Sequence, residues 1–185
     1  MDQTLRTEFQ LGDLTLRAWR EDDIDAAFAI VQQNRKHLQT FMRWMTPEYS
    51  IEDARKFICN AIKDRLDRKT LGLALLSDDK LIGSTGFNRL DWGSRVCEIG
   101  YWIDHRHEGK GSITTACKVM IEYAFDELQM NRVEIRCSAE NLRSAAVPER
   151  LGFKKEGLLR RSEVLNGNNH DFLIFGLLAD DLRLW

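Results

Sequence analysis

The sequence predicts an α+β fold, in which a mixed, mostly antiparallel sheet of six to seven strands carries helices on both faces. Three observations support this prediction. Apolar and polar side chains alternate in several short segments, as they do in half-buried strands. Three of these segments follow one another with only short turns between them, which indicates an antiparallel meander. Segments with the apolar period of a helix separate the other strands, and they supply the layers that cover the sheet.

The first predicted elements are a strand and two helices. Residues 14–19 alternate as a strand should, and residues 24–31 switch to helical spacing after an acidic stretch. The Ser-Ile-Glu-Asp run at residues 50–53 has the spacing of a helix cap, and the apolar side chains after it lie on one helical face. Residues 35–47 lie between the two helices and form either a substrate-facing loop or a second short helix.

The middle of the chain holds the predicted meander. Residues 71–76 and 81–88 are expected to form two strands, because the short polar stretch between them suits a hairpin turn. Residues 96–104 form a third strand after a turn-like segment at residues 91–94. The clearest helix of the chain follows Gly111, where apolar side chains keep a helical period over four turns.

The C-terminal part continues with shorter elements. A strand is expected at residues 133–137, a short helix at 141–150 and an apolar central strand at 172–178. Pro148 falls late in the short helix, where it removes a backbone donor and disfavours helical geometry at Val147, so we expect a kink there. No repeat, low-complexity segment or linker interrupts this order, and residues 1–185 are therefore expected to form one domain.

Composition excludes several classes of function. The net charge is −2 and the basic residues are spread along the chain, so the charge does not favour nucleic-acid binding. The four cysteines form no CxxC pair and the four histidines show no metal-ligand spacing. A signal-peptide core is absent, as is any apolar run of about 18 residues. We therefore expect a cytoplasmic protein that binds no metal, no nucleic acid and no membrane.

A glycine-rich turn, Arg106-His-Glu-Gly-Lys-Gly111, joins the strand that ends at Asp104 to the long helix. Its glycines let the backbone bend so that N–H groups point together, and the helix N-terminus adds unpaired donors and about half a positive charge. Such a turn binds an anion. A Walker loop would need glycine at position 104 and a hydroxyl residue at 111, and a dinucleotide fingerprint would need a third glycine where Thr114 stands, so neither pattern fits.

The pattern that remains, Arg-x-x-Gly-x-Gly, resembles the pyrophosphate-binding motif of the GNAT acyltransferases. The Glu-Ile-Gly-Tyr-Trp-Ile segment at residues 98–103, the Asn141-x-x-Ser144 pair and the Glu-Arg-Leu-Gly-Phe after it resemble the RimJ/RimL-type branch, the ribosomal-protein N-acetyltransferases. The order of elements is similar over residues 14–178, and the motifs themselves match over residues 98–171.

The resemblance implies a binding site for acetyl-coenzyme A. The pantetheine arm of the cofactor would pair with the backbone of the strand at residues 102–104, the amides of the turn would bind the phosphates, and Asn141 would hold the arm from the other side. The residues expected to contact the cofactor are Trp102, Ile103, Asp104, Arg106, His107, Glu108, Gly109, Lys110, Gly111, Ser112 and Asn141.

Acetyl transfer to an amine needs a neutral nucleophile, a polarised thioester carbonyl and a proton for the leaving thiolate. Ser144 corresponds to a hydroxyl residue that the resembling enzymes place near the thiol, so it is the candidate general acid. It could instead be a helix serine that bonds back to its own backbone. The backbone N–H of Trp102 or Ile103 would polarise the carbonyl. The kink expected at Pro148 bears on where Ser144 lies.

Two carboxylates are candidates for the general base. Glu98 shares a strand face with Trp102 by the two-residue period. Glu163 matches a glutamate proposed as the base in RimL-type enzymes, and we prefer it because the match extends through residues 165–167 and 170–171. Each carboxylate could instead be a charge-paired strand residue, and a proton path relayed by water would need neither.

The acceptor is an amine whose class the resemblance narrows. An α-amino group with a pKa near 8 needs only about 1–1.5 kcal/mol to become neutral at pH 7, whereas a lysine needs about 4.6 kcal/mol. A weak base therefore suffices for a protein N-terminus of the ribosomal type, attacked directly in a ternary complex. The alternatives are a polyamine or small-molecule (drug) amine acetyltransferase and a non-catalytic coenzyme-A-binding module.

Aromatic residues also predict self-association. Five tryptophans and several apolar loops exceed the needs of one sheet core, so we expect a homo-oligomer, a dimer or a higher species. Trp44 and Trp92 either line the acceptor cleft or anchor a subunit interface.

Overall fold

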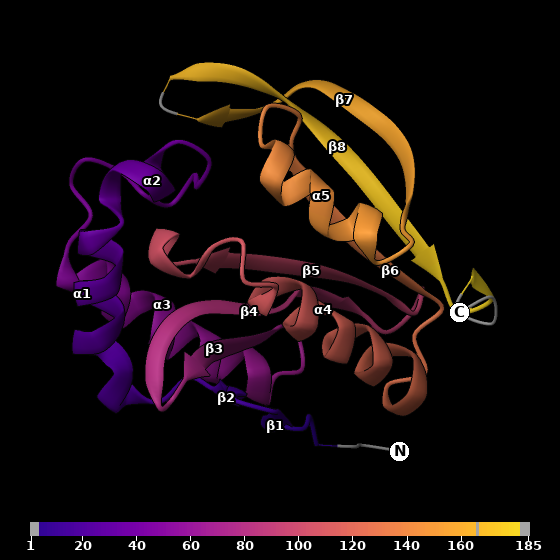
Figure 1. Ribbon diagram of the computed structural model, residues 1–185. Helices are drawn as coiled ribbons and strands as arrows, with labels where there is room; N and C mark the ends of the chain where they lie inside the picture. The colour runs from indigo at the N-terminus through magenta and orange to yellow at the C-terminus, as the bar shows by residue number, and fades with distance from the viewer. Residues whose placement is uncertain (1–3, 166, 182–185) are drawn as a thin grey trace.

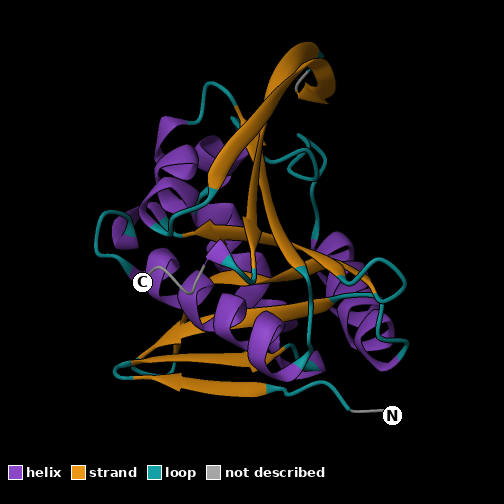
Figure 2. Ribbon diagram, turned by 90° about the vertical axis from the view of Figure 1, so that its right-hand side faces the viewer, coloured by secondary structure: helices purple, strands orange, loops and turns teal. Residues whose placement is uncertain are grey.

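The computed structural model describes residues 4–165 and 167–181, so Asn166 of the matched segment and the C-terminal Trp185 lie outside the description. One eight-stranded sheet runs through the described chain in the order β1-β2-β3-β4-β5-β6-β8-β7, with helices on both faces (Figures 1 and 2). Only β5 and β6 pair in parallel; the other neighbours are antiparallel. The α+β prediction is confirmed, with one strand more than expected.

The strands are β1 (Glu8–Leu11), β2 (Leu14–Ala18), β3 (Leu71–Ser77), β4 (Lys80–Asp91), β5 (Val96–Ile103), β6 (Arg132–Ser138), β7 (Lys154–Leu165) and β8 (Asn168–Leu178). The helices are η1 (Glu21–Asp23), α1 (Ile24–Gln33), α2 (Arg35–Gln39), α3 (Ile51–Leu66), η2 (His105–His107), α4 (Ser112–Glu122), the π-helical η3 (Tyr123–Glu127) and α5 (Leu142–Arg150).

Two strands, β7 and β1, lie outside the residue ranges expected for strands, and the shorter of them is β1. It pairs with β2 through a two-residue turn in which Gly12 takes φ 67°, a conformation that glycine adopts readily. Of its four residues only Phe9 is buried, where its ring meets Tyr123 edge to face. A strand with a single buried residue is too short to show alternation, which is why the sequence pattern did not predict it.

The two faces of the sheet carry different helices. α4 and α5 pack on one face, where Met120, Ala145 and Val147 belong to the main hydrophobic cluster. α1 and α3 cover the other face, where Trp19 and Ile58 belong to a second cluster. Burial of these apolar stripes is the main term that holds the helices on the sheet.

The local predictions for α3 and α5 have different outcomes. Ser50 and Asp53 form the expected capping box at the start of α3. Residues 35–47 were expected to form a loop or a short helix. They form both, since the short helix α2 is followed by a loop. α5 runs without a break from Leu142 to Arg150, although Pro148 lies within it. The proline therefore does not interrupt the helix that carries Ser144.

The sheet opens between β5 and β6. The two strands pair only from Val96↔Arg132 to Ile99↔Ile135, although β5 continues to Ile103 and β6 to Ser138. In Figure 1, β7 and β8 turn away from the direction of β5, and α5 lies beside them. The last residues of β5 are therefore paired on their β4 side and open toward β6.

All four cysteines are free, and Cys97, Cys117 and Cys137 are buried while Cys59 is exposed. Within residues 4–165 and 167–181, no helix is long and apolar enough to cross a membrane. The same ranges contain no group of three or more histidine, cysteine, aspartate or glutamate side chains placed to hold a metal ion.

Candidate active site

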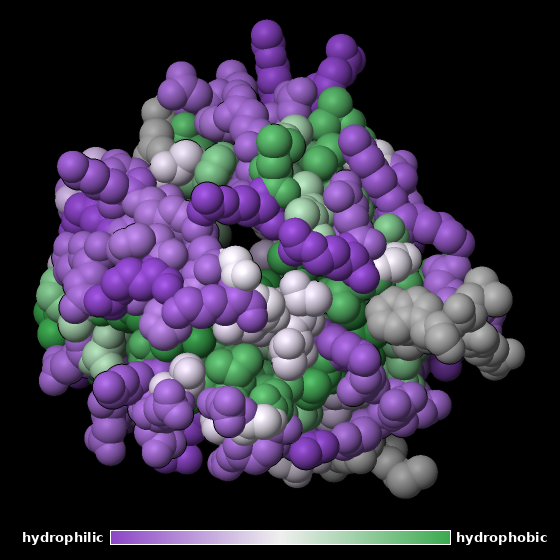
Figure 3. Space-filling view, viewed as in Figure 1, coloured by the Kyte–Doolittle hydropathy of each residue, from purple (hydrophilic) through white to green (hydrophobic). Residues whose placement is uncertain are grey.

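A cleft of about 1190 Å³ lies where β5 and β6 diverge. Figure 3 shows a hollow near the centre of this face, with hydrophilic side chains on its rim. Its walls come from α2 and the loop after it, the end of β5, the turn before α4, the first turn of α4, and α5 with the residues before it. The predicted site residues among those that line it are Trp102, Ile103, His107, Glu108, Gly109, Gly111, Ser112, Asn141 and Ser144.

The turn before α4 presents free amides to this cleft. Gly109 and Gly111 have φ values of 72° and 81°, and a Cβ on either would meet nothing within 4 Å, so conformation rather than crowding requires glycine. The first helical bond is donated by the Thr115 amide to the Gly111 carbonyl at 2.9 Å. No described backbone carbonyl accepts from the amides of residues 109–114. These donors, at a helix N-terminus, can bind an anion.

Asp104 and Arg106 hold the turn in shape. Asp104 is buried, and its carboxylate accepts from the Arg106 amide at 3.0 Å and from its guanidinium Nη2 at 2.5 Å. Burial raises the pKa of Asp104, but the hydrogen bonds from Arg106 outweigh it and lower this pKa to about 2. Arg106 Nη2 also donates to Gln33 Oε1 on α1 at 2.9 Å. Neither Asp104 nor Arg106 lines the cleft, and neither does Lys110.

A buried asparagine ties the same turn to the end of α1. Asn34 Oδ1 accepts from the His105 amide at 2.9 Å and lies 2.7 Å from His105 Nδ1, while its Nδ2 donates to the Ile30 carbonyl at 2.9 Å. The acceptor at Oδ1 assigns the proton to Nδ1 of His105. Asn34 thus anchors the glycine turn through groups other than the amides of residues 109–114.

The end of β5 offers backbone groups along the opening. The Asp104 amide donates to the Ile82 carbonyl at 2.8 Å, and the Gly100 carbonyl accepts from Thr85 Oγ1 at 3.0 Å, so the even-numbered residues face β4. By the alternation of a strand, the amides and carbonyls of Tyr101 and Ile103 point the other way, into the gap. The backbone N–H of Trp102 or of Ile103 was expected to polarise the thioester carbonyl. Of these two, only the N–H of Ile103 points into the gap.

Ser144 lies at the first turn of α5 beside Tyr101. Asn141 caps this helix, because its Oδ1 accepts from the Ser144 amide at 3.0 Å. Ser144 Oγ donates to Tyr101 Oη at 3.2 Å, and Tyr101 Oη donates to the Ser144 carbonyl at 2.9 Å. The serine hydroxyl therefore bonds to another element and not back to its own helix. Burial raises the pKa of Tyr101, which keeps this phenol protonated.

The opposite wall is apolar. Phe41 and Met42 from the loop after α2 line the cleft with Trp102. Trp44 meets Trp102 edge to face, with ring centroids 6.2 Å apart. Trp92 lies elsewhere, since its Nε1 donates to the Arg68 carbonyl at 2.8 Å and its ring stacks with that guanidinium. Neither Trp44 nor Trp92 lines the cleft, but Trp44 contacts Trp102, which does.

Both candidate bases lie outside the cleft lining. Glu98 sits where β5 still pairs with β6, and its Oε2 lies 3.5 Å from Arg136 Nε. Glu163 lies on β7, and its Oε2 accepts from Arg43 Nη1 at 3.3 Å. This contact joins the β7–β8 hairpin to the loop after α2, over which the hairpin tip reaches in Figure 1. Both carboxylates are charge-paired in this structure.

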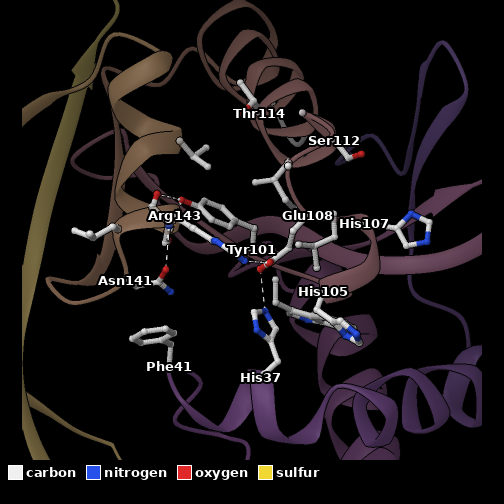
Figure 4. A pocket seen from close by; sticks show the side chains of 18 of the residues that line it. His37, Phe41, Tyr101, His105, His107, Glu108, Ser112, Thr114, Asn141 and Arg143 are labelled. Carbon is white, nitrogen blue, oxygen red and sulfur yellow. Dashed lines mark hydrogen bonds and ion pairs between the residues drawn. The ribbon is translucent and has the colours of Figure 1, made fainter.

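Three ionisable side chains that line the cleft meet there (Figure 4). Glu108 Oε1 lies 2.9 Å from His37 Nε2, and Glu108 Oε2 accepts from Arg143 Nη1. His37 comes from α2 and Arg143 from α5. Sequence reasoning did not single out His37, Arg143 or Tyr101 as site residues. Tyr101 and Arg143 lie within the matched motifs, but a motif does not say which of its side chains face the cleft.

Known proteins are similar to this chain in sequence. A family model described as acetyltransferase (GNAT) domain matches residues 13–154. YdaF of Bacillus subtilis (strain 168) is 36% identical over 166 residues, which cover 89% of this chain and 91% of YdaF. The ribosomal-protein-serine acetyltransferase of Escherichia coli (strain K12) is 29% identical over 167 residues, 90% of this chain and 93% of that protein.

A solved structure has a similar fold. RimL, a ribosomal L7/L12 α-N-protein acetyltransferase in complex with coenzyme A, is similar with a TM-score of 0.88 at 27% identity, over 94% of this chain and 99% of that one. The chain therefore belongs to the GNAT family, as an acetyl-coenzyme-A-dependent N-acetyltransferase.

Proposed function

We propose that this enzyme acetylates the α-amino group of a protein N-terminus of the ribosomal type. The observation that carries the proposal is one continuous cleft that joins the free amides of residues 109–114 to the open edge of β5 and to Ser144. The names of two similar proteins support the choice of acceptor, because one acts on a ribosomal-protein serine and the other on ribosomal L7/L12.

In this proposal the cofactor lies along the cleft. The amides of the turn from Gly109 to Ser112 bind the diphosphate, and the backbone of Tyr101 and Ile103 pairs with the pantetheine arm as an added strand would. Asn141 Oδ1 is already used to cap α5, so its amide nitrogen is the group left to hold the arm from the far side.

The chemistry is direct attack of the amine on the thioester. The amine nitrogen forms a bond to the acetyl carbon, the carbon–sulfur bond breaks, and the thiolate takes a proton from Ser144 Oγ. The Ile103 amide stabilises the oxyanion. Tyr101 holds Ser144 Oγ at 3.2 Å and is a positioning residue. Solvent returns the proton to the serine.

Loss of the amine proton needs little assistance for an α-amine, because its pKa is close to neutrality. Glu163 remains our candidate base. Its place on the hairpin that contacts the loop after α2 supports this role. The ion pair between Glu163 and Arg43 opens easily, because it is exposed to solvent. Glu98 and a water relay remain the alternatives for the same step.

An acceptor panel tests the proposal. Purified enzyme would be incubated with acetyl-coenzyme A and matched peptides from ribosomal protein N-termini, each with a free or a formylated α-amine, together with spermidine and an aminoglycoside. We expect thiol release only with the free α-amine peptides. Preferential acetylation of the polyamine or the aminoglycoside would assign the enzyme to small-molecule amines instead.

We also propose that the enzyme self-associates. Of the four described tryptophans only Trp44, which is 41% exposed, still argues for an interface. Further support comes from β7, an edge strand on which Leu158, Leu159 and Val164 are exposed. Sedimentation at micromolar concentration should give a species larger than a monomer, and a strict monomer would reject this part of the proposal.

A further inference from the structure

Glu108 closes a charged bridge across the mouth of the cleft. It stands immediately before Gly109, the first of residues 109–114, whose amides are free. His37 of α2 and Arg143 of α5 approach its two carboxylate oxygens from opposite sides of the cleft, as the dashed lines in Figure 4 show. One acidic side chain thus contacts two basic side chains and links two walls that are far apart in the sequence.

The position of this carboxylate is unusual for an anion site. The free amides and the helix N-terminus attract negative charge. A diphosphate bound there would lie beside Glu108, and like charges repel unless a cation neutralises one of them. Glu108 is 19% exposed, whereas its partners His37 and Arg143 are 36% and 80% exposed. The two basic side chains can therefore move into solvent or toward a ligand more easily than the carboxylate can.

The neighbouring acid–base pair gives an internal comparison. Asp104 and Arg106 belong to the same turn, but the Asp104 side chain is 2% exposed and neither residue lines the cleft. That pair holds the turn in shape whether or not a ligand is bound. His37, Glu108 and Arg143 all line the cleft, so their contacts can be exchanged when a ligand enters.

We propose, on the basis of the acetyl-coenzyme A site described above, that Arg143 and His37 are phosphate-binding residues and that Glu108 is their internal counterion. Before a ligand binds, Glu108 contacts both basic side chains across the cleft. The incoming diphosphate takes Arg143 from Glu108, because a guanidinium binds phosphate through paired hydrogen bonds, and His37 moves with it. The exchange costs little, since an exposed ion pair contributes only weakly to stability.

Calorimetry with a matched control tests this exchange. Coenzyme A, ADP as a ligand with a diphosphate alone, and phosphate-free pantetheine would be titrated into wild type, Glu108→Gln and Glu52→Gln. Glu52 lies at the start of α3, so its variant has the same charge change away from the cleft. We expect Glu108→Gln to bind coenzyme A and ADP about threefold to tenfold more tightly, with pantetheine and the Glu52 control unchanged. Equal or weaker binding of coenzyme A by Glu108→Gln would overturn the proposal.

A double-variant cycle tests the role of Arg143 separately. Arg143→Gln should weaken coenzyme A binding. When Glu108→Gln is added to Arg143→Gln, the logarithm of the binding constant for coenzyme A should rise by less than half as much as it does when Glu108→Gln is made in the wild type. A full advantage in the Arg143→Gln background would mean that Glu108 acts only by distant repulsion, and it would reject the exchange. Thermal melts of each variant check folding, and His37→Gln, which keeps Glu108, gives a second measure of weakened binding.

The outcomes separate this inference from the proposed function. Wild-type enzyme that binds coenzyme A while Glu108→Gln binds it no better overturns the counterion and leaves the cofactor site standing. Wild-type enzyme that binds neither coenzyme A nor ADP overturns both.

Discussion

The hydroxyl of Tyr101 on β5 donates a 2.9 Å hydrogen bond to the carbonyl oxygen of Ser144 on α5. Pro148 explains why that carbonyl is available. In a helix without proline the residue at 148 would donate its N–H to the carbonyl four residues earlier, and proline has no N–H to give. Tyr101 takes the vacant place, and Ser144 Oγ donates back to the phenol at 3.2 Å. The strand edge and the helix are thereby joined at the point where acetyl transfer is proposed.

Removal of the Tyr101 hydroxyl tests its positioning role. Tyr101→Phe should lower kcat, because Ser144 Oγ loses the partner that orients it, while KM for acetyl-coenzyme A changes little. The Ser144 carbonyl loses its buried donor as well, which should reduce the free energy of unfolding by about 1 kcal/mol. Steady-state kinetics and urea unfolding measure the two effects. An unchanged kcat in a folded Tyr101→Phe enzyme would show that the phenol does not position Ser144.

Ser144 itself should matter for the chemical step. Ser144→Ala is expected to lower kcat by about 10²-fold, since general acids typically contribute 10²–10⁴-fold. Calorimetry should show nearly unchanged binding of acetyl-coenzyme A. Ser94→Ala, in the turn between β4 and β5, is the control and should retain full activity. Wild-type turnover by Ser144→Ala would remove the serine from the mechanism.

The glycines of the turn allow a matched test of conformation. Gly111 and Gly12 both have positive φ, 81° and 67°, and a Cβ on either would meet nothing within 4 Å. Alanine at either position should therefore cost a similar amount of stability, about 1 kcal/mol, through backbone strain alone. Only Gly111→Ala should weaken acetyl-coenzyme A, because Gly12 lies in the β1–β2 turn. Equal affinities in the two variants would place the phosphates somewhere else.

Asp104 predicts a pH dependence of stability. Its pKa is lowered to about 2 in the folded protein, so the stabilisation is present above the unfolded value near 3.8 and is lost as the pH falls through about 2. The difference in unfolding free energy between wild type and Asp104→Asn should narrow by about 1–2 kcal/mol as the pH falls from 5 to 2, after allowance for solvent screening. Urea unfolding across that range measures it. A constant difference would mean that Arg106 does not stabilise the carboxylate.

Much of the fold was predictable because it rests on local patterns. The long apolar period after Gly111 identified α4, and the Ser50 cap placed the start of α3. The sequence did not predict β1, because the only buried side chain of this strand, Phe9, packs on Tyr123, which lies more than a hundred positions away in the sequence. The kink expected at Pro148 was not realised as a break in α5, since the carbonyl it frees finds a donor on another element.

The candidate site was predictable in its backbone and less so in its side chains. The glycine turn follows from residue types that a bent, amide-lined backbone requires. The side chains that face the cleft depend on how β5 and β6 diverge, which local pattern does not encode. For this reason Arg106 was expected at the ligand but is bound to Asp104, whereas His37 entered the site from a helix that no motif covers.

The amides of residues 109–114 provide the most direct test of the account. In ¹⁵N-labelled enzyme, titration with acetyl-coenzyme A should shift the amide resonances of Gly109 and Gly111 until they saturate, while that of Gly12 stays in place. Binding of acetyl-coenzyme A with the Gly109 and Gly111 resonances unmoved would contradict the claim that this turn holds the diphosphate.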